Sequence, residues 1–362
     1  MIRFFLLIIF VLLAQYSSGQ DTAPLDTTAE RRNRLFALPV VFYTPETQLG
    51  FGAAGIYAFN FRGDNPEARS SSVQTVLAYT LNNQLLVNFP FTLFLDNGNY
   101  YTYGEVGYYR YIYQFYGVGN EIDPDGEETY RVNFPRIRFT ALKRVLPKWY
   151  FGLRYWFDDY QIVETTEGGL LATEDITGSR GGIISGPGVA TLFDTRDNVF
   201  YATDGWYIET LLQRNADWTG SDFNYTSITA DVRTYFLTHW NHVVALNAYG
   251  VLQSGNVPFN ELALLGGSRR MRGYFEGQYR EQNLLTMQVA YRAPLFWRIG
   301  AVAFVSYGGV GPQTTDALQN LRYAVGGGLR FLIDQKRKIN LRLDAGFGKN
   351  TSGYYLTIGE AF

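Results

Sequence analysis

The stretch GGSRRMRGYFEGQYREQN, residues 266–283, combines charges, aromatic rings and glycines in a way that could support buried ion pairs. It holds four arginines, two glutamates and three aromatic residues, although only 18% of the whole chain is charged. The arginines are Arg269, Arg270, Arg272 and Arg280. Two glycines precede them and Gly273 follows Arg272, so the backbone can bend tightly at this point.

Two interpretations of this stretch follow from the cost of burying charge. A surface loop leaves its arginines in solvent, where they need no partner. A loop folded into the protein must pair them, because a buried charge without its partner costs about 3–5 kcal/mol. The choice depends on what the elements on either side of the stretch build.

Other patterns that could carry chemistry are weak. The segment GFGAAG, residues 50–55, matches the glycine pattern of dinucleotide-binding loops, but Ile56–Phe59 continues as a strand where that motif requires a helix. The two histidines, His239 and His242, share one short turn with no carboxylate nearby in the sequence. No serine, histidine and acid stand out as a catalytic set. We therefore expect no enzyme activity, no cofactor and no metal site.

The N-terminus and the composition indicate an exported β protein. Residues 1–19 follow the charged, apolar and small-residue order of a secretory signal peptide, and we expect a short periplasmic segment at 20–34 before a barrel domain at 35–362. No later apolar run reaches the length of about 18 residues that a membrane-spanning helix needs. With 28 Tyr, 27 Phe and 38 Gly, the chain is a large soluble β protein or a transmembrane β-barrel. A net charge of −2 implies no nucleic-acid partner.

Alternation favours the barrel. In the segment 340–347, apolar residues interleave with polar ones: Leu341, Leu343, Ala345 and Phe347 against Asn340, Arg342, Asp344 and Gly346. Such segments run to about 10–14 residues, which suits a tilted strand that crosses a membrane better than the strands of about 5–6 residues typical of soluble proteins. We expect sixteen antiparallel strands, the first at Leu35–Thr44 and the last at Tyr354–Phe362.

The connections between the expected strands fall into two sets. One set is short, at 96–99, 147–148, 238–241, 296–297 and 334–338, and the other contains long connections, at 112–130, 164–185 and 255–283. Outer-membrane barrels have short periplasmic turns and longer outer loops. Residues 266–283 therefore belong to the longest outer loop, between strands eleven and twelve.

The charges expected on the inner face of the strands give the lumen a net positive character. They are Arg136, Arg138, Arg154, Arg233, Arg292, Arg330 and Arg342 against Asp231 and Asp344. These side chains either line a water-filled wall or brace a segment inserted into the lumen.

Several stretches resemble the BamA/TamA superfamily of outer-membrane insertases and two-partner-secretion translocators, the bacterial surface antigen barrels. MRGYFEGQ, residues 271–278, is similar to the family's loop motif of Val or Leu, Arg, Gly, and Tyr or Phe, so that the motif positions are Met271, Arg272, Gly273 and Tyr274. DTRDNVFYATDGWYIE, residues 194–209, is similar to a turn of the family and carries Asp194, Arg196 and Asp197. The closing strands and FYTPETQLGFG, residues 42–52, extend the resemblance over the whole barrel.

The resemblance implies a function in the biogenesis of the bacterial outer membrane. We expect an accessory or minimal insertase or translocase that acts with membrane lipids and with other outer-membrane or periplasmic proteins. Only Gln20–Arg34 precede the first strand, so we expect no periplasmic POTRA domains in this chain. The alternative is a passive channel or a structural barrel.

The resemblance also suggests roles for single residues. The family commonly places an inward aspartate opposite the motif arginine, but here that position is Ser306. We expect Arg272 to anchor a lumenal plug by pairing with Asp344, between the inward Arg330 and Arg342; the alternative is that only Ser306 and backbone carbonyls hold it. Tyr354, Leu356, Ile358 and Phe362 are expected on one face, with Phe362 resembling a C-terminal signal for barrel assembly.

Overall fold

The computed structural model of the chain describes residues 34–44, 48–61, 70–123, 126–173, 175–335 and 338–362. The expected signal peptide, residues 1–19, and residues 20–33 of the expected periplasmic segment lie outside the described residues. Within the described ranges, no helix is both long enough and apolar enough to cross a membrane.

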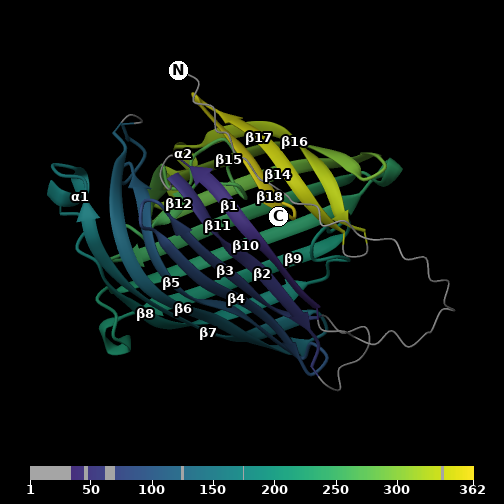
Figure 1. Ribbon diagram of the computed structural model, residues 1–362, viewed down its shortest axis with the longest axis horizontal. Coiled ribbons are helices and arrows are strands. Elements are labelled where there is room, and N and C mark those ends of the chain that lie inside the picture. The colour runs from purple at the N-terminus through teal and green to yellow at the C-terminus, as the bar shows by residue number, and fades with distance from the viewer. Residues whose placement is uncertain (1–33, 45–47, 62–69, 124–125, 174, 336–337) are drawn as a thin grey trace.

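One antiparallel sheet of sixteen strands dominates the structure (Figure 1). The N-terminal strands of this sheet are β1 (Arg34–Thr44), β2 (Gln48–Phe59), β3 (Ser71–Thr80), β4 (Leu85–Leu95), β5 (Tyr100–Phe115), β6 (Glu128–Leu146), β7 (Trp149–Thr165) and β8 (Gly182–Asp194). The C-terminal strands are β9 (Gly205–Asn215), β10 (Tyr225–Leu237), β11 (Val243–Gly255), β14 (Asn283–Phe296), β15 (Ile299–Gly311), β16 (Arg322–Asp334), β17 (Ile339–Gly348) and β18 (Thr351–Ile358). Each strand pairs with the next, and the sixteen-stranded antiparallel fold predicted from the sequence is confirmed.

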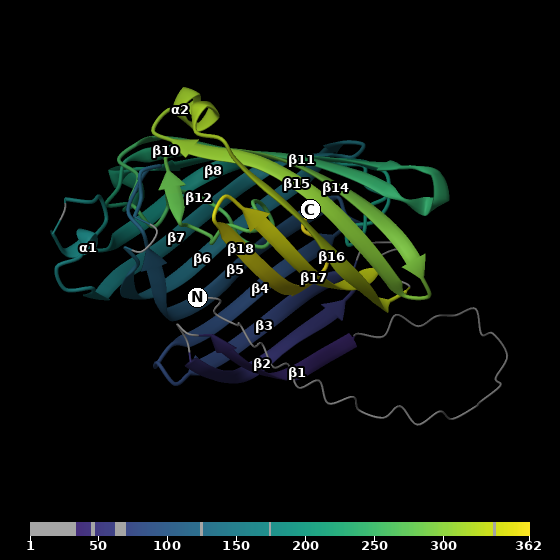
Figure 2. The same cartoon turned by 90° about the horizontal axis from the view of Figure 1, so that it is seen from above.

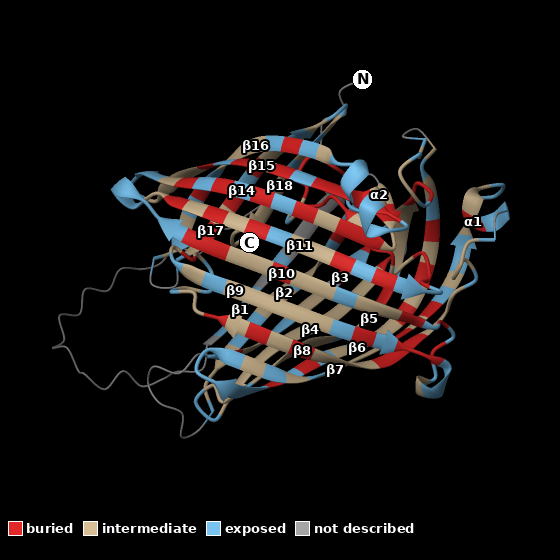
Figure 3. Ribbon diagram, turned by 180° about the vertical axis from the view of Figure 1, so that it is seen from behind, coloured by how far each residue is buried: buried red, intermediate tan, exposed pale blue. Residues whose placement is uncertain are grey.

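Buried and exposed residues alternate along several strands of the sheet (Figure 3). In β17, Leu343 is 50% exposed on the outer side, whereas its neighbours Arg342 and Asp344 are 2% and 1% exposed. In β10, Ile228 is exposed and Asp231 is buried. Apolar side chains therefore cover the outer surface that faces lipid, and charged side chains point into the lumen.

The wall of the barrel differs in height around its circumference. β5, β6 and β7 contain 16, 19 and 17 residues, whereas β17 and β18 contain 10 and 8. Among the described residues, each strand of the sheet is hydrogen-bonded to its neighbours in the order from β1 to β18, and no pairing joins β1 to β18. The two ends of the sheet are thus built from its shorter strands.

Short helices and one small hairpin occupy the connections. The helices are α1 (Leu170–Thr173), η1 (Asp217–Thr219), η2 (His239–Asn241) and α2 (Thr314–Gln319). The long connection at 255–283 contains regular structure, because β12 (Ala263–Leu265) and β13 (Tyr279–Glu281) pair as a two-stranded stem within it. The stem forms because its apolar residues are buried: Ala263 is 6% exposed and Leu265 is 0% exposed.

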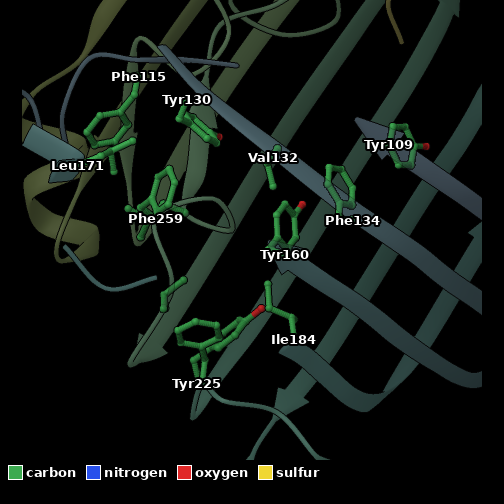
Figure 4. Packing of buried hydrophobic residues seen from close by; sticks show 13 residues of the cluster. Tyr109, Phe115, Tyr130, Val132, Phe134, Tyr160, Leu171, Ile184, Tyr225 and Phe259 are labelled. Carbon is green, nitrogen blue, oxygen red and sulfur yellow. The ribbon is translucent and has the colours of Figure 1, made fainter. Parts of the chain in front are cut away.

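An aromatic cluster fills the lumen beside the tall strands (Figure 4). Tyr109 of β5, Phe134 of β6 and Tyr160 of β7 stack in a row, with ring centroids 4.7 and 4.4 Å apart. Phe259, from the connection after β11, packs against Phe115 with a centroid distance of 5.3 Å. The long connection therefore reaches the wall opposite its own strands.

Candidate functional site

The connection between β11 and β14 folds into the barrel, as the sequence predicted. Figure 2 shows β12 inside the curve of the barrel strands. Met271, Arg272 and Tyr274 are 0%, 1% and 2% exposed. Met271 and Tyr274 belong to an apolar cluster that also contains Val251, Ala263, Leu265, Leu284, Val310 and Ala324. The loop motif is therefore an interior element.

Arg272 is held by one ion pair and one aromatic ring. Its Nη1 lies 2.6 Å from Oδ2 of Asp344 in β17, and the two side chains are 1% and 0% exposed. Its guanidinium carbon lies 3.4 Å from the ring centroid of Phe304 in β15, which is a close cation–π contact. Ser306, the alternative partner, donates its hydroxyl to Gln288 at 3.4 Å. The structure thus brings Arg272 and Asp344 together.

Asp344 is shared among three arginines. Arg330 Nη1 donates to its Oδ1 at 2.6 Å, and Arg342 Nη1 lies 3.7 Å from its Oδ2. Arg342 also donates Nε to Thr357 Oγ1 at 2.7 Å. Loss of this one carboxylate would leave three buried guanidinium groups without the acid that they share.

Gly273 lets the motif backbone approach the wall closely. Its φ of +116° favours glycine, and a Cβ at this position would lie 2.9 Å from the carbonyl carbon of Gly346 in β17. The Gly273 N–H donates to Tyr355 Oη at 3.0 Å, and Tyr355 Oη donates to the carbonyl of Tyr274 at 3.3 Å. Thr351 Oγ1 donates to the carbonyl of Gly273 at 2.8 Å. The motif is therefore clamped to β17 and β18 through its backbone.

The arginines before the motif are held by β11 and β14. The guanidinium carbon of Arg270 lies 3.4 Å from the ring centroid of Tyr249. Gln288 Nε2 donates both to the carbonyl of Arg269 at 3.1 Å and to Asn247 Oδ1 at 3.0 Å. These contacts hold residues 269–270 against β11 and β14, and none of them involves Asp344 or the arginines bound to it.

A second anchor ties the connection to the tall wall. Glu261, ahead of β12, lies with its Oε1 2.7 Å from Arg138 Nη2 in β6. Arg138 also pairs with Asp158 of β7. Arg136 links this pair to β5, because its Nη2 lies 3.1 Å from Asp158 Oδ2 and its Nη1 lies 3.2 Å from Glu105 Oε1. The loop therefore contacts both sides of the lumen through charged side chains.

The turn between β8 and β9 is held by its own side chains. Arg196 Nε donates to Asp194 Oδ1 at 2.9 Å. Asp197 accepts hydrogen bonds from the Thr203 hydroxyl at 2.6 Å and from the backbone N–H of Thr203 and Asp204 at 2.8 and 3.2 Å. Partial burial by itself would raise the pKa of Asp197, but these hydrogen bonds hold the pKa below its usual range. The turn at 195–204 is thus ordered by its own side chains, at the end of the barrel that the sequence predicts to be periplasmic.

The expected position of Phe362 is wrong. Tyr354 and Ile358 are 67% and 72% exposed on the outer face, as predicted, but β18 ends at Ile358 and Phe362 is only 7% exposed. Arg292 Nη2 of β14 donates to the Phe362 carbonyl at 2.6 Å inside the barrel. The strand period stops at Gly359, whose φ is +86°, so the alternation no longer applies. A role of Phe362 as an assembly signal stays a prediction.

Several residues of this site were missed from the sequence. They are Phe304, Gln288, Tyr355, Glu261 and Glu360. Phe304 could have been found, because it lies two positions before Ser306 and side chains two apart share one face of a strand. Glu261 lies in a segment without strand periodicity. Glu360, which pairs with Arg330, was placed in the last expected strand, but β18 ends before it.

The two histidines lie at the turn between β10 and β11. Across the described residues, no group of three or more His, Cys, Asp or Glu side chains is placed to hold a metal ion. His239 lies in η2, and His242 Nδ1 is hydrogen-bonded to Tyr291 Oη.

Comparisons with known proteins agree with this geometry. The model of the Omp85 superfamily domain matches residues 147–362. Among solved structures, the chain is similar to BamA from Haemophilus ducreyi lacking POTRA domains 1–3, with a TM-score of 0.58, 16% identity, and coverage of 91% of this chain and 69% of that one. It is also similar to CdiB from Acinetobacter baumannii, with a TM-score of 0.57, 14% identity, and coverage of 90% and 59%. No curated protein matches.

The similarity to solved structures shows the fold, and the match to the family model also shows the family. The matched region contains the turn at 195–204, the loop motif and every strand to which that motif is clamped. It covers more than half of the chain. The chain belongs to the Omp85 superfamily, a family of outer-membrane insertases and translocators.

Proposed function

We propose that this barrel acts in outer-membrane biogenesis, as a minimal or accessory insertase or translocase that works with partner proteins. The observation that carries this proposal is the loop motif clamped inside the lumen, with Arg272 paired to Asp344. A lumen filled by a loop that is ion-paired at both walls is poorly suited to steady conduction. The partners would be outer-membrane lipids and outer-membrane or periplasmic proteins that supply periplasmic domains. Residues 1–19 would direct export of the chain as a signal peptide that is then cleaved.

The heights of the strands support an action on the surrounding bilayer. A membrane-crossing β-strand needs about 9–11 residues, and β18 has 8, whereas β6 has 19. A hydrophobic element shorter than the bilayer is accommodated by local thinning of the membrane. The lipid beside β17 and β18 would then be the place where a polypeptide meets the smallest barrier to insertion.

The test is an assembly assay in liposomes. The purified chain is reconstituted, an unfolded outer-membrane barrel is added with a periplasmic chaperone, and the rate of appearance of the folded client is followed by its altered mobility in unheated gels. We expect the wild type to accelerate client folding over empty liposomes and Arg272→Gln to lose this acceleration. Arg270→Gln is the matched control, because it removes a neighbouring loop arginine that lies outside the Asp344 group.

The alternative function, a passive channel or structural barrel, predicts the opposite pattern. Single-channel recordings of the wild type would then show a steady pore, and client folding would not exceed that in empty liposomes. A small, flickering conductance together with accelerated folding supports the insertase. Purification of the chain from its native membrane would identify the partners that an accessory subunit requires.

A further inference from the structure

The chain leaves the barrel wall after β18 and turns into the lumen. Ile358 is 72% exposed to the outside, whereas Ala361 and Phe362 are each 7% exposed. Gly359 makes the turn with a φ of +86°, and its N–H donates to the carbonyl of Asn340 at 2.8 Å. We call Gly359–Phe362 the latch segment.

Polar contacts hold the latch segment to three strands. Arg330 Nε of β16 donates to both carboxylate oxygens of Glu360, at 3.0 and 2.9 Å. Asn340 Nδ2 of β17 donates to Glu360 Oε1 at 3.0 Å. Arg292 of β14 donates from Nη2 to the Phe362 carbonyl at 2.6 Å. Glu360 is only 5% exposed, so its charge is compensated inside the protein.

Apolar contacts join the latch segment to the periplasmic turn. Phe362 and Ala361 belong to a buried cluster that also contains Ala202, Tyr235, Val243, Ala245, Ala290, Val302 and Phe304, with Tyr201 packed against it. Arg292 Nη1 donates to the carbonyl of Ala202 at 3.4 Å, which ties the turn at 195–204 to the same group. The ring of Phe304 also makes the cation–π contact with Arg272. The latch segment thus lies between the periplasmic turn and the loop motif.

One chain of charges connects the latch segment with the loop. Arg272 binds Asp344, Asp344 binds Arg330, and Arg330 binds Glu360. Four buried arginines (Arg272, Arg292, Arg330 and Arg342) surround two carboxylates (Asp344 and Glu360), so each acid must serve more than one cation. While Arg272 occupies one oxygen of Asp344, Arg330 depends on Glu360 for its second partner. If Arg272 left, Asp344 would be shared by Arg330 and Arg342 alone, so Asp344 would attract Arg330 more strongly and the hold of Arg330 on Glu360 would weaken.

We propose that the latch segment is a releasable stopper of the periplasmic side of the lumen and that the loop motif controls its release through Asp344 and Arg330. Seating of Arg272 strengthens the hold on Glu360, and withdrawal of Arg272 loosens it. Movement of the outer loop is thereby transmitted to the opposite end of the barrel. Arg272 and Glu360 are positioning residues in this device, and they act on each other through two intervening side chains.

The test uses the absence of cysteine from the sequence. The full chain with Ala361→Cys, folded in detergent or liposomes, carries one thiol, and its rate of labelling by a maleimide reports release of the latch segment. Labelling is compared in backgrounds with Glu360→Gln, which breaks the latch directly, Arg272→Gln, which acts from a distance, and Arg270→Gln as the matched control. Coupling between sites is commonly about fivefold or more, so we expect at least about fivefold faster labelling with Arg272→Gln and with Glu360→Gln.

A reference thiol separates release of the latch from general unfolding. Ala190→Cys lies in a buried cluster of β6 and β8, away from the latch segment, and should label slowly in every background. With Arg270→Gln, labelling at position 361 should stay close to that of the unmodified background. The proposal is overturned if Arg272→Gln leaves labelling at position 361 unchanged, if Arg270→Gln accelerates it equally, or if position 190 labels as fast as position 361.

Discussion

Two buried aspartates organise opposite walls of the lumen in different ways. Asp158 lies against Arg136 and Arg138, which are both residues of β6, so its own ion pairs stay within the wall and the loop joins this group only through Arg138. Asp344 lies against Arg330 of β16 and Arg272 of the loop, so its group joins the wall to a segment that arrives from the outer side. Both aspartates have fully buried side chains. Only Asp344 pairs directly with a residue of the loop.

The loop also contacts the two walls with opposite charges. At the tall wall it contributes the acid, Glu261, to Arg138, and at the short wall it contributes the cation, Arg272, to Asp344. Arg138 keeps Asp158 if Glu261 leaves, whereas Arg272 has one acid partner among the described residues. We infer that the contact with the short wall sets the position of the loop and that the contact with the tall wall supports it.

The largest expected effect comes from removing either aspartate. Asp344→Ala and Asp158→Ala should each lower the free energy of unfolding by about 3–5 kcal/mol, because each leaves buried guanidinium groups without their acid. Only Asp344→Ala should release the loop, which trypsin would then cut at its arginines while the barrel stays folded on an unheated gel. Equal tryptic cleavage of the loop in both variants would remove the distinction between the walls.

The next effect concerns the two faces of the short wall. Leu343→Arg places a charge on the outer face of β17, which costs about 2–4 kcal/mol near the middle of the bilayer. Arg342→Leu removes one cation from a group that has more arginines than acids, so folding should suffer much less. The folded fraction after refolding into liposomes measures both variants, and equal damage would contradict the inward placement of Arg342.

A smaller effect compares the two contacts of the loop. Double-mutant cycles with alanine at Arg272 and Asp344, and at Glu261 and Arg138, should each give a coupling energy within the usual range of about 0.5–3 kcal/mol. We expect the first coupling to be the larger, because Arg138 retains Asp158 as a partner. Thermal unfolding and pore conductance both serve as readouts. A larger coupling for Glu261 and Arg138 would reverse the assignment of main and supporting contact.

The smallest effect belongs to the periplasmic turn. The pKa of Asp197 is lowered in the folded chain, so its contribution to stability is present above the pKa of an unfolded aspartate, about 3.9, and is lost as pH falls through the lower folded value. The stability difference between the wild type and Asp197→Asn should therefore shrink below about pH 4. A difference that stays constant down to pH 2 would show that Asp197 acts through packing instead of charge.

Much of the wall could be predicted because strand alternation is local. The inward positions of Arg330, Arg342 and Asp344 follow from a period of two, and a shift of one residue would place charge in lipid. The sorting of short and long connections likewise fixed which end of the barrel carries the loop. The pairing of Arg272 with Asp344 was expected because Ser306 takes the position where the family commonly has its aspartate and Asp344 is an inward carboxylate of a nearby strand. Arg272 Nη1 and Asp344 Oδ2 lie 2.6 Å apart.

The sequence by itself determined the strands, their faces and the inward entry of a glycine-rich loop, because these depend on neighbours within a few residues. The tertiary structure alone decided which partners meet. Glu261 pairs with Arg138, which lies 123 positions away in the chain. Phe362 lies inside the barrel, where Arg292, 70 positions earlier, donates a hydrogen bond to its carbonyl. No local period encodes such contacts, since they arise only when the curled sheet brings distant strands around one lumen.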